Sequence, residues 1–237
     1  MDAIFSAYVT NLGKYNEGQL VGEYLKFPTT TEEVQDLLKR IGVDGVRYEE
    51  IFITDYESSI DGLCRYMGEF ESIDELNYLA ALLDELSPDE LEKFEAAVDA
   101  GEYTGSAKNL INLAQNLDCY ELYPDVHDED DLGRMYILEF GAMTVPEHLI
   151  DYIDYEGYGR DVRINESGTF TDRGYFVDSG SSFMELYSGR DDIPEEHRVF
   201  ALPKLSIREQ MAAYKEVADR AAPDMEKHKP KPGREDR

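Results

Sequence analysis

The sequence predicts an α+β protein in which strands and helices fall in separate blocks. Three observations support this class. The first 60 residues contain short runs of β-branched and aromatic residues bounded by Gly, Asn or Pro. From about residue 59 the apolar residues recur at spacings of three and four, as in helices. After the acidic loop at residues 124–133 the two patterns are mixed.

Three strands and one helix are expected in the first block. The expected strands are 4–9, 20–25 and 51–54. A helix follows Thr30, which can form a capping box with Glu33, and Gly42 is placed to end it. The order is therefore strand, strand, helix, strand.

Short consecutive helices are expected in the second block, starting near Leu63, Ser72, Ser87 and Ser106. Ser72 and Ser87 are each followed three residues later by a glutamate, as in a capping box. Gly101 is placed to end the third helix. Helices this short are expected to pack on one another as a small bundle.

The third block predicts both kinds of element. Strands are expected at 135–140, 160–164 and 169–177, a short helix at 146–153, and an amphipathic helix at 206–221. Residues 225–237 are expected to be a disordered tail.

The chain is strongly acidic, with 52 Asp and Glu against 23 Lys and Arg and a formal net charge of −29. Residues 51–200 hold 36 acids and 9 bases, whereas residues 201–237 hold 7 acids and 9 bases. Such a charge repels nucleic acid and anionic membranes and attracts basic grooves. The composition therefore argues against direct nucleic acid or membrane binding and favours a basic protein partner.

Acids are concentrated on one side of the expected helix after Ser87. On a helical wheel Asp89, Glu92, Glu95 and Asp99 form a ridge beside the apolar face, about 4.5 to 6 Å apart along the axis. A DNA strand carries one phosphate per about 3.4 Å. Like charges one turn apart destabilise a helix by about 0.2–0.5 kcal/mol, so folding does not explain the ridge. A merely solvated acidic face is the alternative.

The cysteines and the ends of the chain bear on its compartment. Cys64 and Cys119 fit neither a disulfide framework nor a metal-ligand spacing, and they are expected to be small buried residues in a reducing compartment. The N-terminus has no signal-peptide pattern, and no stretch approaches the ~20 apolar residues of a membrane span. We therefore expect a cytoplasmic protein.

The sequence resembles the ArdA antirestriction proteins over roughly residues 3–177. The segments that carry the resemblance are AYVTNLGKYNEGQLVGEYLKFP, EEIFITDYES, LAALLDELSPDELEKFEAAVDAG, VPEHLIDYIDYEGYGRDV and GTFTDRGYFV. They occur in the order found in the family. NLGKYNEG and YIDYEGYGRD are the most specific of these motifs.

The resemblance implies a DNA mimic encoded on mobile genetic elements such as conjugative transposons or plasmids. Family members are elongated, three-domain, dimeric proteins whose surface carboxylates imitate the phosphates of bent duplex DNA. They occupy the DNA-binding groove of type I restriction-modification enzymes, in which the methyltransferase core works with the specificity subunit.

For this chain the resemblance implies three domains and an addition. They are an N-terminal α+β domain at 1–58, a central acidic helical domain at 59–103, a third α+β domain at 104–178 and a C-terminal extension at 179–237. Family members usually end before this extension. Its near-neutral charge argues against a further phosphate-like surface, and it could cover an edge or the dimer surface.

The family has no catalytic residues to transfer, so the candidate partner-binding groups are carboxylates on faces expected to be exposed. They are Glu69, Glu71, Asp74, Glu75, Asp84, Glu85, Asp89, Glu92, Glu95, Asp99, Asp125, Asp128, Glu129, Asp130, Asp131, Asp151, Asp154 and Glu156. Exposed ion pairs are each worth about 0–1 kcal/mol, so single substitutions should have small effects and charge removal should act cumulatively.

Other functions are less well supported. The sequence has no P-loop, GxSxG, HExxH or GxGxxG motif, and its four histidines have no metal-ligand spacing, so we predict a protein that is not an enzyme and needs no cofactor or metal. Residues 125–131 alternate like a calcium loop, but Asp130 stands where Gly is needed and Tyr136 where Glu is needed. Halophilic adaptation would also acidify the C-terminal end.

Two alternatives stay open. The acidic chain could inhibit another DNA-binding protein, such as a nucleoid factor or a glycosylase, because charge mimicry is promiscuous. Tyr152, Tyr155 and Tyr158 could form an interface stripe, or they could be ordinary core and boundary residues.

Overall fold

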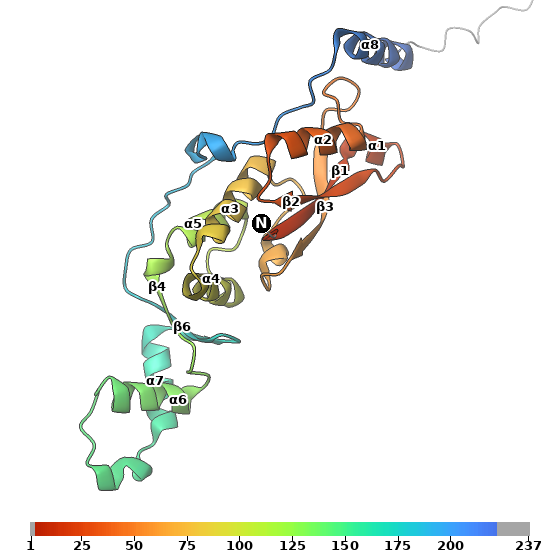
Figure 1. Ribbon diagram of the computed structural model, residues 1–237. Helices are drawn as coiled ribbons and strands as arrows, with labels where there is room; N and C mark the ends of the chain where they lie inside the picture. Colours follow the sequence, from red (N-terminus) through yellow and green to blue (C-terminus); the bar gives the residue numbers. More distant parts are fainter. Residues whose placement is uncertain (1–2, 222–237) are drawn as a thin grey trace, which may run out of the picture.

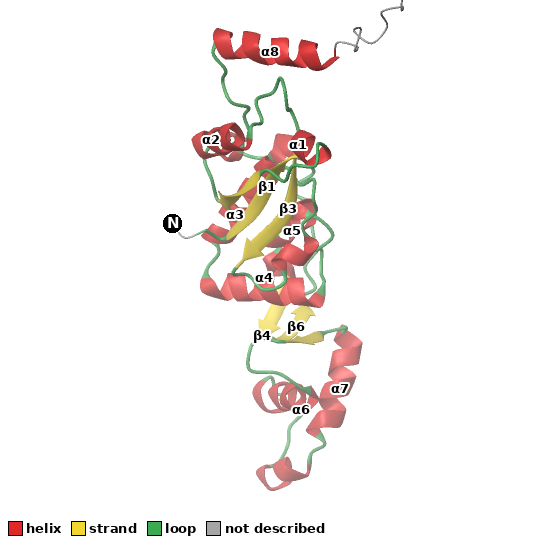
Figure 2. Ribbon diagram, turned by 90° about the vertical axis from the view of Figure 1, so that its right-hand side faces the viewer, coloured by secondary structure: helices red, strands yellow, loops and turns green. Residues whose placement is uncertain are grey.

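The computed structural model describes residues 3–221 and has an elongated α+β architecture. Two small antiparallel sheets lie at different levels along its length, and α4 lies between them (Figures 1 and 2). The α+β class predicted from the sequence is therefore confirmed. In the part of the chain that the structure describes, every helix is too short or too polar to cross a membrane.

The first sheet has the order β2-β1-β3 and consists of β1 (Phe5–Asn11), β2 (Gly22–Phe27) and β3 (Ile51–Ser58). The three expected strands are thus confirmed, with ends shifted by a few residues. Alternate side chains of β1 (Phe5, Ala7 and Val9) enter the core, as the period of a strand requires. The short helix α1 (Leu12–Asn16), which the sequence analysis did not predict, directly follows β1.

Helix α2 (Thr31–Ile41) follows β2 and forms as predicted. The Thr30 side chain accepts a hydrogen bond from the backbone of Glu33, whose carboxylate accepts one from the backbone of Thr30. Gly42 ends the helix with φ +81°, a left-handed conformation that favours glycine. Local chemistry therefore sets both ends of this helix.

The helical middle contains a 3-10 turn and three α-helices. They are η1 (Leu63–Tyr66), α3 (Ile73–Glu85), α4 (Pro88–Ala100) and α5 (Ala107–Ala114). The capping box predicted at Ser87 is present. The one predicted at Ser72 is wrong, because the Glu75 carboxylate accepts a hydrogen bond from the Tyr187 hydroxyl at 2.7 Å instead. The helix expected from Leu63 is only one turn long.

The second sheet, of order β4-β6-β5, consists of β4 (Tyr120–Tyr123), β5 (Thr169–Thr171) and β6 (Gly174–Asp178). The strand predicted at 169–177 is therefore a hairpin with its turn at Asp172 and Arg173. Strand β4 was not predicted. It pairs with β6, more than 50 residues later in the chain.

Between β4 and β5 the chain is helical. The elements are α6 (Glu129–Arg134), the π-helical turn η3 (Met135–Glu139), the 3-10 helix η4 (Glu147–Tyr152) and α7 (Tyr155–Glu166). The short helix expected at 146–153 is confirmed as η4. The strands expected at 135–140 and 160–164 are wrong, because those residues belong to η3 and α7. Apolar runs this short do not distinguish a strand from a buried helical turn.

Two glycines let α6 and α7 pack with almost no space between their backbones. A Cβ atom added at Gly159 would lie 1.9 Å from the Glu129 carbonyl oxygen, and one added at Gly133 would lie 2.0 Å from that of Tyr155. Gly159 belongs to the motif YIDYEGYGRD. The glycines of this segment therefore reflect a close helix crossing rather than a strand.

One continuous core joins the first sheet to α3, α4 and α5 and extends to Phe176 and Tyr187. A smaller apolar cluster, which includes Leu132, Met135 and Tyr175, holds α6 to the second sheet. The domain boundaries implied at 58/59, 103/104 and 178/179 stay predictions.

The C-terminal extension runs back along the molecule from β6 toward the first sheet (Figure 1). It contains the 3-10 turns η5 (Arg190–Asp192) and η6 (Glu195–His197) and ends in α8 (Ile207–Ala221), which confirms the helix expected at 206–221. The tail expected at 225–237 lies outside the described residues. The extension covers a face of α3 and α5.

Candidate partner-binding surface

The candidate carboxylates do not share one environment. Eight of the candidate carboxylates have no hydrogen-bond or ion-pair partner within residues 3–221, and their residues are exposed or half-exposed. These are Glu69, Asp84, Glu85, Asp89, Glu92, Asp125, Asp151 and Glu156. They extend from the segment before α3 to η4 and α7, in the lower part of Figure 1. Their charge is therefore available to a partner along most of the length of the molecule.

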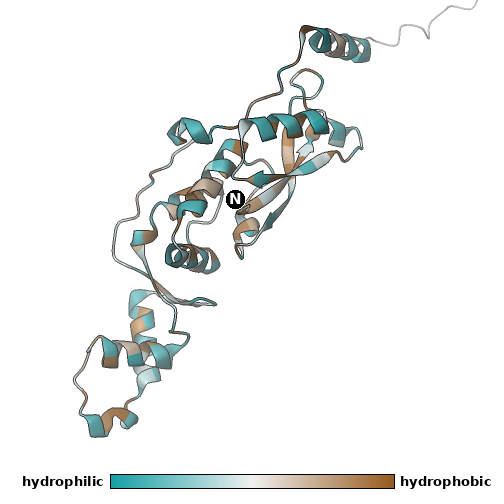
Figure 3. Cartoon of the chain, in the orientation of Figure 1, coloured by the Kyte–Doolittle hydropathy of each residue, from teal (hydrophilic) through white to brown (hydrophobic). Residues whose placement is uncertain are grey.

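Helix α4 presents the ridge predicted from its sequence, with one exception. Phe94 and Val98 are buried, and Asp89 and Asp99 point to solvent. Figure 3 shows the outer ribbon of α4 as hydrophilic. The exception is Glu95, whose carboxylate lies 2.8 Å from the Arg173 guanidinium and whose side chain is only 12% exposed. Burial raises the pKa of Glu95, against the opposing effect of Arg173.

Asp74 was expected to be exposed, and the structure shows that it is buried. It is 2% exposed, and its carboxylate accepts hydrogen bonds from Arg190 Nε at 2.9 Å and from the Phe200 backbone N–H at 2.7 Å. The side of α3 that carries Asp74 was expected to face solvent, but the C-terminal extension lies on it. A buried, fully bonded carboxylate contacts no external partner.

Glu71 and Glu75 are also used within the chain. Glu71 accepts hydrogen bonds from the backbone N–H groups of Gly68 at 3.1 Å and Ala107 at 3.4 Å. Glu75 accepts one from the Tyr187 hydroxyl. Both side chains are half-buried, so they contribute less surface charge than the sequence analysis expected.

The carboxylates of the acidic loop gather at the N-terminus of α6. Asp128 caps the helix by accepting from the Asp131 backbone N–H at 2.9 Å, and Asp131 accepts from the His127 N–H at 3.2 Å. Negative charge is stabilised at a helix N-terminus. Asp130 pairs with Arg134, and Glu129 lies 3.3 Å from Arg163 Nε.

The calcium-loop pattern in this region has a different structural use, because the loop residues cap and pair along α6. Within the described part of the chain, no group of three or more His, Cys, Asp or Glu side chains has the geometry to hold a metal ion.

The far tip combines acids with exposed apolar side chains. Asp154 caps α7 by accepting from the Gly157 N–H at 2.9 Å, and Asp151 and Glu156 are exposed beside it. Leu149 and Tyr152 of η4 are exposed apolar residues at this tip, and Leu138, Phe140, Met143 and Ile164 are exposed elsewhere in the segment between β4 and β5.

The three tyrosines of this segment differ in exposure. Tyr152 is 83% exposed, whereas Tyr155 is 3% exposed and lies beneath the Arg134 guanidinium, 4.3 Å from its ring centroid. Tyr158 is half-buried. They are therefore not a single interface stripe.

Further exposed carboxylates were not singled out from the sequence. Asp55 and Glu57 lie on β3, where the Tyr24 hydroxyl donates to Asp55 and this hydrogen bond raises the pKa of Tyr24 to about 12. The alternation of β3 could have indicated these two acids.

The C-terminal extension adds five exposed acids, although its near-neutral charge suggested otherwise. They are Glu185, Asp191, Asp192, Glu195 and Glu196.

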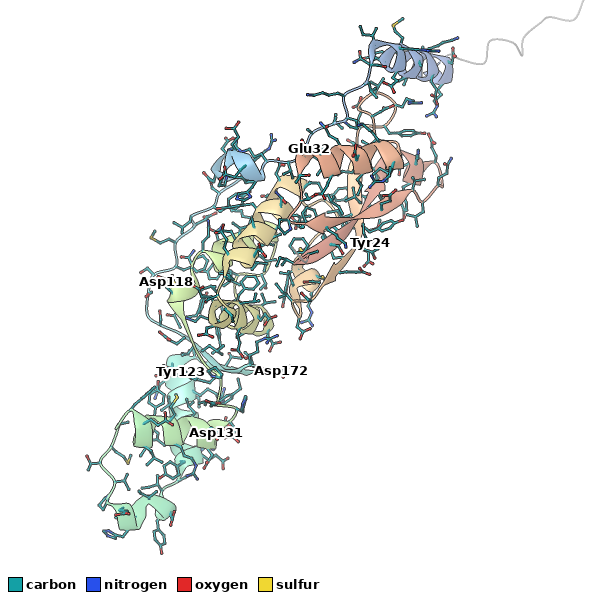
Figure 4. All side chains as sticks on the ribbon, in the orientation of Figure 1. Tyr24, Glu32, Asp118, Tyr123, Asp131 and Asp172 are labelled. Carbon is teal, nitrogen blue, oxygen red and sulfur yellow. The ribbon has the colours of Figure 1, made fainter. Side chains whose placement is uncertain are left out.

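The side chains in Figure 4 point outward on more than one side of the molecule. Tyr24, Asp172 and Asp131 lie along one long edge of the view, and Asp118 lies on the opposite edge. Asp172 is at the tip of the β5–β6 hairpin, where its backbone N–H donates to Asp99 of α4 at 3.4 Å. The acidic surface of the second sheet is thus continuous with that of α4.

Comparison with known proteins identifies one family. The sequence profile of the antirestriction protein (ArdA) family matches residues 7–177, which is well over half of the chain. No curated protein matches the sequence. The matched region includes both sheets and helices α1 to α7, and it ends where the extension begins.

Proposed function

Because the chain belongs to the ArdA family of antirestriction proteins, whose partners are restriction-modification enzymes, we propose that it acts as a mimic of duplex DNA. It would occupy the DNA-binding groove of a type I enzyme, formed by the methyltransferase core with its specificity subunit. Incoming DNA is then not bound and escapes cleavage. This mechanism needs no catalytic residue and no cofactor.

The observation that carries the proposal is the set of eight exposed or half-exposed carboxylates without hydrogen-bond or ion-pair partners, which are spread from Glu69 to Glu156. A basic groove gains favourable electrostatic energy from such a surface over its whole length. Residues 51–200 hold 36 acids and 9 bases, a net charge of −27. Duplex DNA carries one charge per about 1.7 Å, so this net charge corresponds to roughly 46 Å of double helix. That length is suited to filling a groove rather than to contacting a single basic patch.

The spacing of charge on α4 supports the same proposal. Asp89, Glu92 and Asp99 extend along one outer side of the helix, and Glu95 is withdrawn toward Arg173. The remaining charges are about 4.5 and 10 Å apart along the axis. A DNA strand carries one phosphate per about 3.4 Å, so α4 alone has fewer charges than a strand of the same length. Other elements must supply the remaining charges.

A competition titration tests the proposal. A type I methyltransferase core bound to fluorescent duplex containing its site is titrated with the full chain at two salt concentrations. Displacement at stoichiometric protein that weakens steeply with salt is expected, because bound ions return to the groove when the complex dissociates. No displacement at large excess would refute groove occupation, and a nucleoid factor or a glycosylase in the same assay tests the alternative partner.

Charge variants separate mimicry from ordinary contacts. Neutralising Glu92 alone should change the affinity by less than about 1 kcal/mol, and neutralising Asp84, Glu85, Asp89 and Glu92 together should weaken binding cumulatively. The matched control replaces Glu32 by Gln, because that exposed carboxylate lies on α2, outside the tested set. If the Glu92 variant alone lost all inhibition, a distributed mechanism would be wrong.

We further propose that the protein is a homodimer. The exposed apolar side chains of η4 at the far tip, Leu149 and Tyr152, favour a second copy as the covering surface, since exposed apolar patches mark interaction sites. Light scattering measures the mass of the particle. A Tyr152→Asp, Leu149→Asp variant should be monomeric, and a wild-type chain that is already monomeric would refute the proposal.

A further inference from the structure

A segment of the C-terminal extension, which contains the short turns η5 and η6, lies on α3 and α5 in the manner of a bound peptide. Residues 183–200 pass these helices in Figure 1 and contact them through separate anchor points. Three apolar side chains of the segment, Tyr187, Ile193 and Val199, are at most 3% exposed. Its intervening residues are exposed or half-exposed.

Asn112 of α5 and Asn116, which lies just beyond the end of that helix, hold the backbone of this segment. The Asn112 amide donates to the Tyr187 carbonyl at 2.8 Å and accepts from the Tyr187 N–H at 2.9 Å. Asn116 makes the same pair of bonds with Met184, both at 2.9 Å. Two asparagines four residues apart thus bind the backbones of Tyr187 and Met184, which are three residues apart. Because these bonds reach only main-chain atoms, they would hold an extended peptide of any sequence.

Side chains supply the sequence preference. The Tyr187 hydroxyl donates to Glu75 at 2.7 Å, and Arg190 Nε donates to Asp74 at 2.9 Å. The Ile193 side chain is packed in the core. These anchors are three residues apart, so the face recognises the pattern Tyr-x-x-Arg-x-x-Ile.

The two sides of this contact differ in origin. The residues that receive the segment, among them Asp74, Glu75, Asn112 and Asn116, all lie inside the part of the chain that matches the family. The segment itself begins after residue 177, beyond the match. The receiving face thus lies inside the family match, and the segment that covers it lies outside.

We propose that the α3–α5 face is a peptide-binding site, that residues 183–200 are its ligand, and that the same segment from a second copy of the chain can replace it. The tether gives the segment an effective concentration of about millimolar or more, so the site is filled within one copy under ordinary conditions. Exchange between copies would join them through their extensions. This inference does not rest on DNA mimicry.

The test uses the full chain with a protease recognition sequence inserted between Ser181 and Ser182, which are both exposed. After cleavage, the two fragments are titrated with a fluorescent synthetic peptide of residues 183–200, and binding is followed by anisotropy. The uncut chain is the reference. We expect the cut protein to exchange its own segment for the peptide and the uncut protein to bind at least about tenfold less, because its ligand is tethered.

Peptide variants test the anchors. Replacing Tyr187 or Arg190 by Ala in the peptide should weaken binding about tenfold or more, since a buried ring or a charged hydrogen bond is lost. The matched control is Met184→Ala, because the Met184 side chain is 56% exposed and only its backbone is held. Circular dichroism of the cut protein follows its folding throughout.

Each outcome decides the proposal. Uptake of the peptide by folded, cut protein, with the expected order of variants, supports a reversible peptide site. A cut protein that retains its own segment against excess peptide, that unfolds as the segment leaves, or that binds all three variant peptides equally would overturn it. In those cases the segment is an inseparable part of the core or binds without the anchors.

Discussion

The crossing of α6 and α7 allows a substitution whose effect can be worked out from the structure. In Gly159→Ala the new Cβ atom would lie 1.9 Å from the Glu129 carbonyl oxygen and 2.7 Å from the Gly133 nitrogen. Both neighbours are backbone atoms, so no side chain can rotate away. Restoring a contact of about 3.5 Å requires the helices to separate by roughly 1.5 Å.

The expected cost is the difference between two terms. Overpacking costs about 1–3 kcal/mol, occasionally more, and the higher helix propensity of alanine returns up to about 1 kcal/mol. We place Gly159→Ala at a loss of about 2 kcal/mol, because backbone rather than side chain must move. For a chain of this size that lowers Tm by about 4 to 8 °C.

Thermal and urea unfolding measure the change, with Asp161→Ala as the matched control. Asp161 is exposed in the same helix, so its replacement should alter stability by less than about 0.5 kcal/mol. A Gly159→Ala chain as stable as the wild type would refute the reasoning and would mean that α6 and α7 are not in backbone contact.

Two further predictions concern a cap and an ion pair. Ser87→Ala should cost about 1 kcal/mol in urea unfolding because the capping box is lost, whereas Ser72→Ala should cost only a few tenths, since Ser72 makes no side-chain cap bond; equal costs would contradict the cap assignment. Arg173→Ala should raise the pKa of Glu95 further, as an NMR titration of the carboxyl would show. Because Arg173 stabilises only the ionised carboxylate, the loss of stability in Arg173→Ala should be smallest at acidic pH, where Glu95 is protonated, and grow as pH rises through the folded pKa of Glu95; a pH-independent loss would contradict the ion pair.

Capping and alternation could be predicted from the sequence because their causes are local. The box at Ser87, the left-handed end at Gly42 and the alternating core residues of β1 each depend on residues within a few positions of one another. The same holds for the acidic ridge of α4, which depends only on helical geometry. The net charge and the family motifs also need no structure, and they led to the antirestriction family.

Tertiary contacts decided which carboxylates are available to a partner. Asp74 is buried by residues 116 and 126 positions later in the chain, and Glu95 is paired with an arginine on a distant hairpin. No periodicity in α3 or α4 carries information about those partners. A helical wheel identifies the side that faces away from its own core, but only the fold shows whether another segment covers that side.

The same limit explains the errors in secondary structure. Residues 160–164 alternate like a strand, yet they belong to α7, which Asp154 caps and which packs against α6 where Gly133 and Gly159 let the two backbones meet. Strand β4 exists because β6 pairs with it. The charge balance, the cap at Ser87 and the family motifs can be read from the residues alone, because none of them needs a distant contact. The course of the extension and the exposure of each acid follow from contacts between residues far apart in the chain, so they needed the fold.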